Sequence, residues 1–166
     1  MGAIGGKLLK LLEPFNCKVL YYDPFLKKKI KNKYAKPVTL KMGLKTANIV
    51  SMHIPLNDKT KKIVNSDFLK NMRNDAIFIN TSRGKIINEL DLIKKLKQYP
   101  NFTACLDVFY DEPLKKDHPF IKLKNTILSP HISTSTLNTK LDMSEEVLDN
   151  IIKFNNKNTK FKNFLI

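Results

Sequence analysis

Polar side chains follow four apolar stretches of the chain. His53 ends "NIVSMH", Arg83 ends "AIFINTSR", Glu112 lies beyond "ACLDVF", and His131 ends "TILSPH". Such stretches are typical of buried strands, and ligands of open α/β sheets bind outside the carboxyl ends of the strands. We therefore expect these side chains to lie along one edge of a sheet.

This set of side chains suits hydride transfer to a 2-oxo acid. The planar guanidinium of Arg83 can hold a carboxylate and polarise a carbonyl. His131 can give a proton to the forming alcohol oxygen, and Glu112 can fix its tautomer. Simpler roles stay open: a surface ion pair for Arg83, a capping or buried role for His131, and an ordinary loop position for Glu112. We expect His53 to pack near a cofactor and His118, in "KKDHPF", to be structural.

The first residues, "MGAIGG", match part of a phosphate-binding turn. In the pattern G-x-G-x-x-G, glycines let the backbone approach a pyrophosphate, which binds at the N-terminus of the next helix. Gly2 and Gly5 fit the second and third glycines, with Ala3 and Ile4 between them. The first glycine, and the central strand that carries it, are therefore expected upstream. Without that strand, its two neighbours would have unpaired edges.

Asp23 is the residue that connects these glycines to a dinucleotide. It ends the next predicted strand, 21 residues after Gly2. A carboxylate at this place accepts hydrogen bonds from the ribose hydroxyls and repels a 2′-phosphate, which favours NAD over NADP. The alternative is that Asp23 only begins a turn after the strand.

Helical and strand patterns alternate along the whole chain. This alternation predicts an α/β domain with a doubly wound parallel sheet covered on both faces. The expected helices lie in "GGKLLKLLEPF", "TLKMGLKTA", "NSDFLKNM" with an Asn or Ser cap, "NELDLIKKLKQY" with Asn88 as cap, and residues 133–156. The expected strands are "CKVLYYD", "NIVSMHI", "DAIFINTS", "FTACLDVF" and "NTILSPH".

Composition limits the class of protein. The chain has 166 residues, 42% of them hydrophobic, and no apolar run long enough to span a bilayer. Its formal net charge is +15, but lysines are spread along the chain, so we interpret the charge as a solvated surface. We interpret Cys17 and Cys105 as buried thiols of a reduced, cytoplasmic protein, with no disulfide and no metal site.

Four segments resemble, in order and spacing, the NAD-binding domain of the D-isomer-specific 2-hydroxyacid dehydrogenases, with the phosphoglycerate dehydrogenase branch most similar. They are "VSMHIPLNDKTKKIVN", "FINTSRGKIINELDLIKKL", "ACLDVFYDEPL" and "HPFIKLKNTILSPHIS". The resemblance implies NAD as cofactor, a small 2-hydroxy or 2-oxo acid as substrate, and a homodimer joined through this domain. It implies a catalytic set of Arg83, Glu112 and His131. The implied cofactor contacts are Gly2, Ala3, Ile4, Gly5, Asp23, Pro55, Thr81, Ser82, Asp107 and Ser133.

The resemblance also sets domain boundaries. Residues 1–152 correspond to the NAD-binding domain without its first strand, and residues 153–166 form a tail that could return to the family's small substrate domain. The rest of that domain has no counterpart here, and an open cleft would expose the reaction to water. Three alternatives remain: a non-catalytic NAD-binding regulatory module, an inactive remnant, and nucleic-acid binding through the lysines, which no motif supports.

Overall fold

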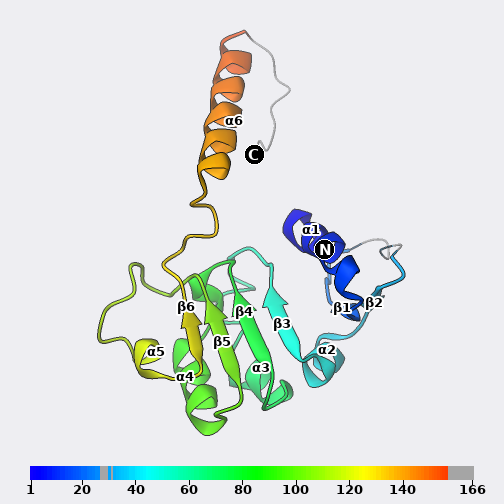
Figure 1. The fold of residues 1–166 in the computed structure, drawn as a ribbon, viewed down its shortest axis with the longest axis vertical. Helices are drawn as coiled ribbons and strands as arrows, with labels where there is room; N and C mark the ends of the chain where they lie inside the picture. Colours follow the sequence, from blue (N-terminus) through cyan, green and yellow to red (C-terminus); the bar gives the residue numbers. More distant parts are fainter. Residues whose placement is uncertain (27–29, 31, 157–166) are drawn as a thin grey trace. The chain divides into compact units, whose positions relative to one another are not determined.

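The structure, a computed structural model, describes residues 1–26, 30 and 32–156. The helices are α1 (Ala3–Leu12), α2 (Leu40–Thr46), α3 (Ser66–Asn71), α4 (Glu89–Gln98), α5 (Pro119–Lys122) and α6 (Leu137–Asn155), with 3-10 turns at η1 (Glu13–Phe15) and η2 (Gly84–Ile86). The strands are β1 (Val19–Tyr21), β2 (Ala35–Pro37), β3 (Ile49–Met52), β4 (Ile77–Asn80), β5 (Thr103–Leu106) and β6 (Thr126–Leu128). The chain forms two compact units, Met1–Pro130 and His131–Ile166 (Figure 1). The predicted domain boundary near residue 152 stays a prediction.

The strands form two separate parallel sheets. β3, β4, β5 and β6 are neighbours in chain order, and β1 pairs with β2 (Figure 1). Parallel neighbours need a crossover between them, and helices α3, α4 and α5 supply the three crossovers of the larger sheet. The α/β class with a parallel sheet is therefore confirmed. The break falls between β1 and β3, the two strands that the expected central strand would join.

The two faces of the four-stranded sheet differ in burial. Phe78, Ala104 and Leu106 lie on one face of β4 and β5, and all three are buried. Phe78 contacts Phe68 of α3 edge to face, with ring centroids 6.4 Å apart, so α3 covers this face. On the other face the residues are half-buried or exposed, and Ile127 of β6 is 64% exposed. Among the described residues, the expected cover is therefore complete on one face only.

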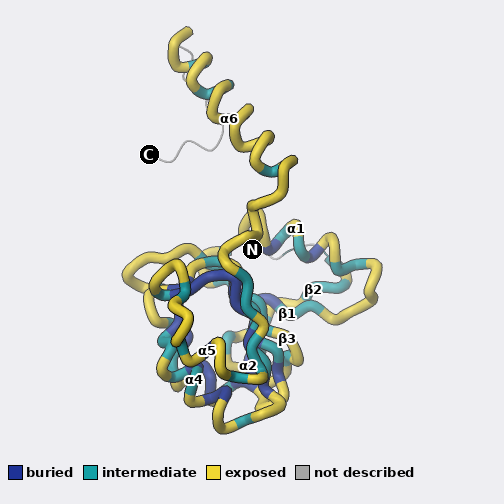
Figure 2. The backbone as a smooth tube through the Cα atoms, turned by 60° about the vertical axis from the view of Figure 1, so that its left-hand side comes forward, coloured by how far each residue is buried: buried dark blue, intermediate teal, exposed yellow. Residues whose placement is uncertain are grey.

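The apolar core of the first unit lies between Leu44 and Phe120 in the sequence. Figure 2 shows this region as the darkest part of the tube, where buried residues are concentrated. Helix α4 packs on the core through Leu92 and Leu96, which are almost completely buried. Lys95, on the same helix, is also buried; its Nζ donates a hydrogen bond to Asn74 Oδ1 at 2.7 Å. Burial lowers the pKa of Lys95.

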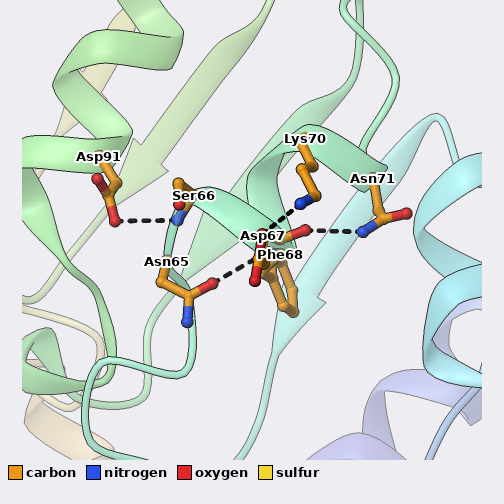
Figure 3. Close-up of polar contacts among 7 residues, drawn as sticks. All are labelled: Asn65, Ser66, Asp67, Phe68, Lys70, Asn71 and Asp91. Atoms are coloured by element: carbon orange, nitrogen blue, oxygen red, sulfur yellow. Dashed lines mark hydrogen bonds and ion pairs between the residues drawn. The ribbon is translucent and has the colours of Figure 1, made fainter.

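Helix α3 begins at a polar cluster that connects it to α4 (Figure 3). The side chain of Asn65 accepts a hydrogen bond from the backbone N–H of Phe68, so the predicted cap is confirmed. Asp91, in the first turn of α4, accepts a hydrogen bond from the backbone N–H of Ser66 at 2.9 Å. The two helices on the buried face are therefore joined at their N-terminal ends.

Three predictions about local structure need correction. The sequence predicts no strand at Ala35–Pro37, because "AKP" lacks an apolar pattern; β2 forms as one strand of a two-stranded pair, where proline is tolerated. Asn88 is the residue before α4, but its side chain makes no capping hydrogen bond. The last helix begins at Leu137 rather than at residue 133, because Thr136 caps it by accepting from the backbone N–H of Thr139.

The two thiols differ in exposure. Cys105, in β5, is half-buried, and burial raises the pKa of its thiol. Cys17 is exposed and lies before β1 begins, so its predicted burial is wrong. An apolar stretch indicated a strand there, but the strand starts two residues later. Both cysteines are free thiols.

Among its described residues, the second unit consists mainly of helix α6. In this helix, whose residues are all described, none is buried (Figure 2). Its exposed apolar side chains include Leu137, Leu141, Leu148 and Ile152, at spacings that place them on one side of a helix. Among the described residues, no helix is both long and apolar enough to cross a lipid bilayer.

Candidate functional site

The end of β4 is built around Asn80. This side chain is completely buried, and its hydrogen bonds go to Ser82 and Arg83, two of the next three residues. Its Nδ2 donates to the backbone oxygen of Arg83 at 3.0 Å, and its Oδ1 accepts from the backbone N–H and the hydroxyl of Ser82 at 3.1 and 2.8 Å. The buried amide of Asn80 therefore fixes the turn that carries Thr81, Ser82 and Arg83.

Arg83 lies just beyond the end of β4, the position that was predicted for it, and it is exposed. One guanidinium nitrogen, Nη1, donates to the backbone oxygen of Ser82 at 2.6 Å. Within the described residues, Arg83 forms no ion pair with a carboxylate. The other arginine, Arg73, forms two hydrogen bonds with Asp75 at 2.9 and 2.8 Å. Arg83, unlike Arg73, therefore presents a guanidinium that can receive an anionic ligand.

The loop after β5 contacts the turn after β4 through Gly84. A Cβ atom at Gly84 would lie 1.8 Å from the backbone oxygen of Phe109, so only glycine permits this approach. Glu112 belongs to the same loop, and its Oε1 accepts a hydrogen bond from the backbone N–H of Phe109 at 3.0 Å. The peptide bond from Glu112 to Pro113 is cis. The loops that carry Arg83 and Glu112 are therefore packed backbone to backbone.

Asp107 follows β5 directly and is buried, with 4% of its surface exposed. Its Oδ1 accepts a hydrogen bond from the hydroxyl of Ser129 at 2.6 Å, and its backbone N–H donates to the backbone oxygen of Asn80. Ser129 follows β6, so Asp107 lies between the ends of β4 and β6. The predicted strand-end position of Asp107 is what the structure shows; its contact with a nicotinamide stays a prediction.

The glycine turn and Asp23 lie together at the start of α1. Gly2 is the N-cap residue of this ten-residue helix, and no acidic residue occupies the first turn. Asp23 lies beyond the end of β1, where its carboxylate accepts from the Met1 amino group and from the backbone N–H of Phe25. These contacts hold the pKa of Asp23 below its ordinary value, and the contact with the amino group has the largest effect.

This arrangement fits a dinucleotide. The free N–H groups and the dipole at a helix N-terminus attract a phosphate, and the first turn of α1 brings no opposing carboxylate. A Cβ atom at Gly2 would have no neighbour within 4 Å, which leaves space for a close approach, while Ala3 and Ile4 begin the helix. Gly5 is buried, and its Cβ position is 3.3 Å from Met1 Sδ. A carboxylate beside such a turn suits the ribose hydroxyls.

Other predicted residues lie along the strand ends or have structural contacts. His53 follows β3, its Nε2 is 2.9 Å from the hydroxyl of Ser51, and burial lowers its pKa. Pro55 lies two residues further on, where its backbone oxygen accepts from the Thr60 hydroxyl at 2.7 Å. His118 caps α5 through Nδ1, which accepts from a backbone N–H at 3.3 Å; its predicted structural role is confirmed.

His131 and Ser133 belong to the second compact unit, whereas Arg83 and Glu112 belong to the first. His131 has a positive φ of 52°, a left-handed conformation that is uncommon for residues other than glycine. Ser133 precedes α6 rather than forming part of it. The pairing of His131 with Glu112 stays a prediction.

Sequence reasoning missed the residues that hold the site loops in place. Asn80 ends the otherwise apolar strand "IFIN" and is buried. A polar residue at the end of an apolar run was the signal that could have identified it. Glu89 Oε1 accepts a hydrogen bond from the backbone N–H of Tyr110 at 3.0 Å, and Glu89 Oε2 lies 3.5 Å from His118 Nε2. The contact with Tyr110 connects α4 to the loop after β5. Gly84 and Ser129 gave no distinct signal, because their partners Phe109 and Asp107 are distant in the sequence.

Comparison with known families gives one match over most of the chain. Residues 1–133 match the family described as "D-isomer specific 2-hydroxyacid dehydrogenase, NAD binding domain". A glyoxylate reductase from Korarchaeum cryptofilum is 35% identical over 155 residues, which cover 93% of this chain and 47% of that protein. The chain thus spans about half the length of the relatives it matches.

Solved structures show the same fold. A D-lactate dehydrogenase with NAD⁺ from Lactobacillus jensenii aligns with a TM-score of 0.87 and 26% identity, covering 100% of this chain and 53% of that one. An NAD-dependent formate dehydrogenase from Staphylococcus aureus, in complex with NAD, aligns with a TM-score of 0.86 and 28% identity, covering 98% of this chain and 48% of that one.

Proposed function

The chain belongs to the D-isomer-specific 2-hydroxyacid dehydrogenase family, as its NAD-binding domain, and on this premise we propose that it takes part in NAD-dependent interconversion of a 2-hydroxy acid and a 2-oxo acid. The observation that carries the proposal is the guanidinium of Arg83. It stands at the carboxyl end of a central strand, without a carboxylate partner among the described residues, beside the loop that holds Glu112. The predicted phosphoglycerate dehydrogenase branch stays a prediction.

We assign the following roles. NAD, when bound, accepts or donates the hydride. Gly2, Ala3, Ile4 and Gly5 would hold its pyrophosphate at the start of α1, and Asp23 would accept hydrogen bonds from the adenosine ribose. Asp107 would bind the nicotinamide carboxamide, and Pro55, Thr81, Ser82 and Ser133 would line the cleft.

Arg83 would bind the substrate carboxylate with its planar fork and polarise the carbonyl. His131 would give a proton to the oxygen when the 2-oxo acid is reduced, and would take it back in the opposite direction. Glu112 would orient the imidazole.

The first experiment is NADH binding to the 166-residue chain by calorimetry, with NADPH as the control. We expect NADH to bind and NADPH to bind more weakly, because the carboxylate of Asp23 repels a 2′-phosphate. NADH oxidation is then measured with glyoxylate, hydroxypyruvate and pyruvate. A folded chain that binds neither cofactor would refute the proposal.

Arg83→Lys tests the anion site, with Arg73→Lys as the matched control. Lysine cannot form the bidentate contact, so we expect Arg83→Lys to lower kcat/KM at least about a hundredfold. Arg73→Lys should leave kcat/KM unchanged, because Arg73 is bound to Asp75.

His131→Ala should lower turnover at least about a hundredfold without changing NADH affinity. Normal turnover in either site variant would contradict the assigned role.

A second candidate function is a regulatory module that binds NAD without turnover. The observation that favours it is α6, whose apolar side chains are exposed along the helix and mark an interaction surface. NADH binding without oxidation of any 2-oxo acid would support this candidate.

We further propose a homodimer in the cytoplasm. The two free thiols fit a reducing compartment, and exposed apolar residues fit an interface. Analytical ultracentrifugation between micromolar and hundred-micromolar concentrations tests the association, and a monomer throughout would exclude the dimer.

A further inference from the structure

Asn80 holds a position that suits a task beyond stability. It is a fully buried amide at the end of β4, on the face where its neighbours Phe78 and Leu106 are apolar. A buried amide without hydrogen bonds costs about 1–3 kcal/mol, so its partners define why it is there. Those partners are Ser82 and Arg83, the turn at the carboxyl end of the strand.

We propose that Asn80 is the positioning residue of Arg83, an inference that rests on the proposed role of Arg83 in binding the substrate carboxylate. Asn80 uses both ends of its amide on this turn. The Nδ2 donor holds the backbone oxygen of Arg83, and the Oδ1 acceptor holds the backbone N–H and the hydroxyl of Ser82. Asn80 thus holds the two ends of the Ser82–Arg83 dipeptide, the backbone N–H of Ser82 and the backbone oxygen of Arg83.

The fixed backbone also determines where the guanidinium of Arg83 lies. Nη1 of Arg83 donates to the backbone oxygen of Ser82 at 2.6 Å, the residue that Asn80 holds. Gly84 then packs against the backbone of Phe109, which is bonded to the carboxylate of Glu112. Asn80 therefore supports the turn from the core, and Gly84 holds it against the neighbouring loop.

Asn125 is a natural control within the same sheet. It immediately precedes β6, and its Nδ2 donates to the backbone oxygens of Leu96, Tyr99 and Phe102 at 3.0, 3.3 and 2.7 Å. It is an asparagine with several backbone partners, like Asn80, but it lies at the amino end of a strand, away from Arg83. Loss of Asn125 should lower stability without changing the site.

The test uses the two arginines as reporters. Phenylglyoxal modifies accessible guanidinium groups, and peptide mass spectrometry measures the rates at Arg83 and Arg73 in one reaction. In Asn80→Ala the turn loses three hydrogen bonds, so we expect the ratio of the Arg83 rate to the Arg73 rate to rise at least about threefold. Asn80→Ser, which keeps a hydroxyl, gives the second variant if the first does not fold. In Asn125→Ala the ratio should equal that of the wild type.

Kinetics give a second readout. In a chain that shows turnover, Asn80→Ser should raise KM for glyoxylate about tenfold while KM for NADH stays within about twofold, because only the carboxylate site is loosened. Adding Asn80→Ser to Arg83→Lys should have little further effect, since Asn80 acts through Arg83.

The outcomes separate the two proposals. A folded Asn80 variant in which the Arg83-to-Arg73 ratio changes as little as in Asn125→Ala would overturn the role of Asn80. Absence of turnover in the wild-type chain would instead count against the proposed activity, and the labelling ratio would still decide on Asn80.

Discussion

Residues 40–130 fold around a continuous apolar core, whereas the described part of residues 1–37 has two three-residue strands, one α-helix and one 3-10 turn, with few buried side chains. Among the described residues of that first segment, Leu9 and Tyr21 are the only large apolar ones that are buried, and neither belongs to the core cluster. The candidate substrate-binding residues Arg83 and Glu112 lie in the region with the continuous core, residues 40–130. The candidate cofactor-binding residues Gly2 and Asp23 lie in residues 1–37.

This difference suggests that the two halves of the site depend on different parts of the fold. Buried area is the main source of stability, so loops that project from the core remain fixed when the N-terminal segment loosens. The cofactor residues have no such support, and the edges of β1 and β3 are not paired with each other. Binding of a dinucleotide should therefore stabilise residues 1–37 more than residues 40–130.

The largest effect is expected for Gly84→Ala. Its Cβ would lie 1.8 Å from the backbone oxygen of Phe109, and backbone cannot rotate away as a side chain can. We expect a loss of more than about 4 kcal/mol in the free energy of unfolding, measured by urea denaturation. Gly6→Ala is the matched control: apart from the adjacent residues and the backbone of its own helix, nothing lies within 4 Å of that Cβ position, and alanine in α1 should stabilise by about 0.5–1 kcal/mol. Equal stability of the two variants would contradict the close packing of the loops.

Phe78→Ala and Leu9→Ala compare the two regions directly. Phe78 is completely buried against Phe68, so its truncation should cost about 3–5 kcal/mol and speed hydrogen exchange throughout β3 to β6. Leu9→Ala should cost about 2 kcal/mol and speed exchange only in α1, β1 and β2. Faster exchange in β4 of Leu9→Ala would show that the two regions form one cooperative unit.

Asp23→Asn tests the cofactor half alone. Asparagine keeps the size of the side chain but removes a charged acceptor for ribose hydroxyls, so NADH affinity should fall about tenfold. The preference for NADH over NADPH should narrow, since the repulsion of a 2′-phosphate is lost. Asp75→Asn, which removes an exposed carboxylate bound to Arg73, is the control in calorimetry. An unchanged affinity in Asp23→Asn would contradict the ribose contact.

The smallest effect concerns Lys95, a buried charge in the core region. Burial lowers its pKa in the folded state below the value of about 10.4 in an unfolded chain. Between these two pKa values the unfolded chain binds more protons, so stability rises with pH in that window, and the penalty persists below it. Lys95→Met should lack this rise, which we expect to be about 2 °C or less in Tm between pH 8 and 10. An identical pH dependence of Tm in both proteins would contradict the assignment.

Much of the fold and part of the site could be predicted from local patterns. Apolar runs followed by polar residues predicted β3 to β6 and the strand-end positions of Arg83 and Asp107, because the strands of a covered parallel sheet are mostly apolar. β2 could not be predicted, because "AKP" forms a strand only by pairing with β1. The exposure of Cys17 was missed for a similar reason: the strand begins later than the apolar stretch.

Local patterns predicted the class of fold, all of its larger elements, and which residue types stand at the strand ends, and the motifs indicated the family. How those residues are held became visible only in the folded chain. The amide of Asn80 on the Arg83 turn, the approach of Gly84 to Phe109, and the hydroxyl of Ser129 on Asp107 join segments that are separate along the chain or fold back on it. Local patterns reflect burial and backbone preference, whereas such contacts depend on which strand ends become neighbours when the sheet forms.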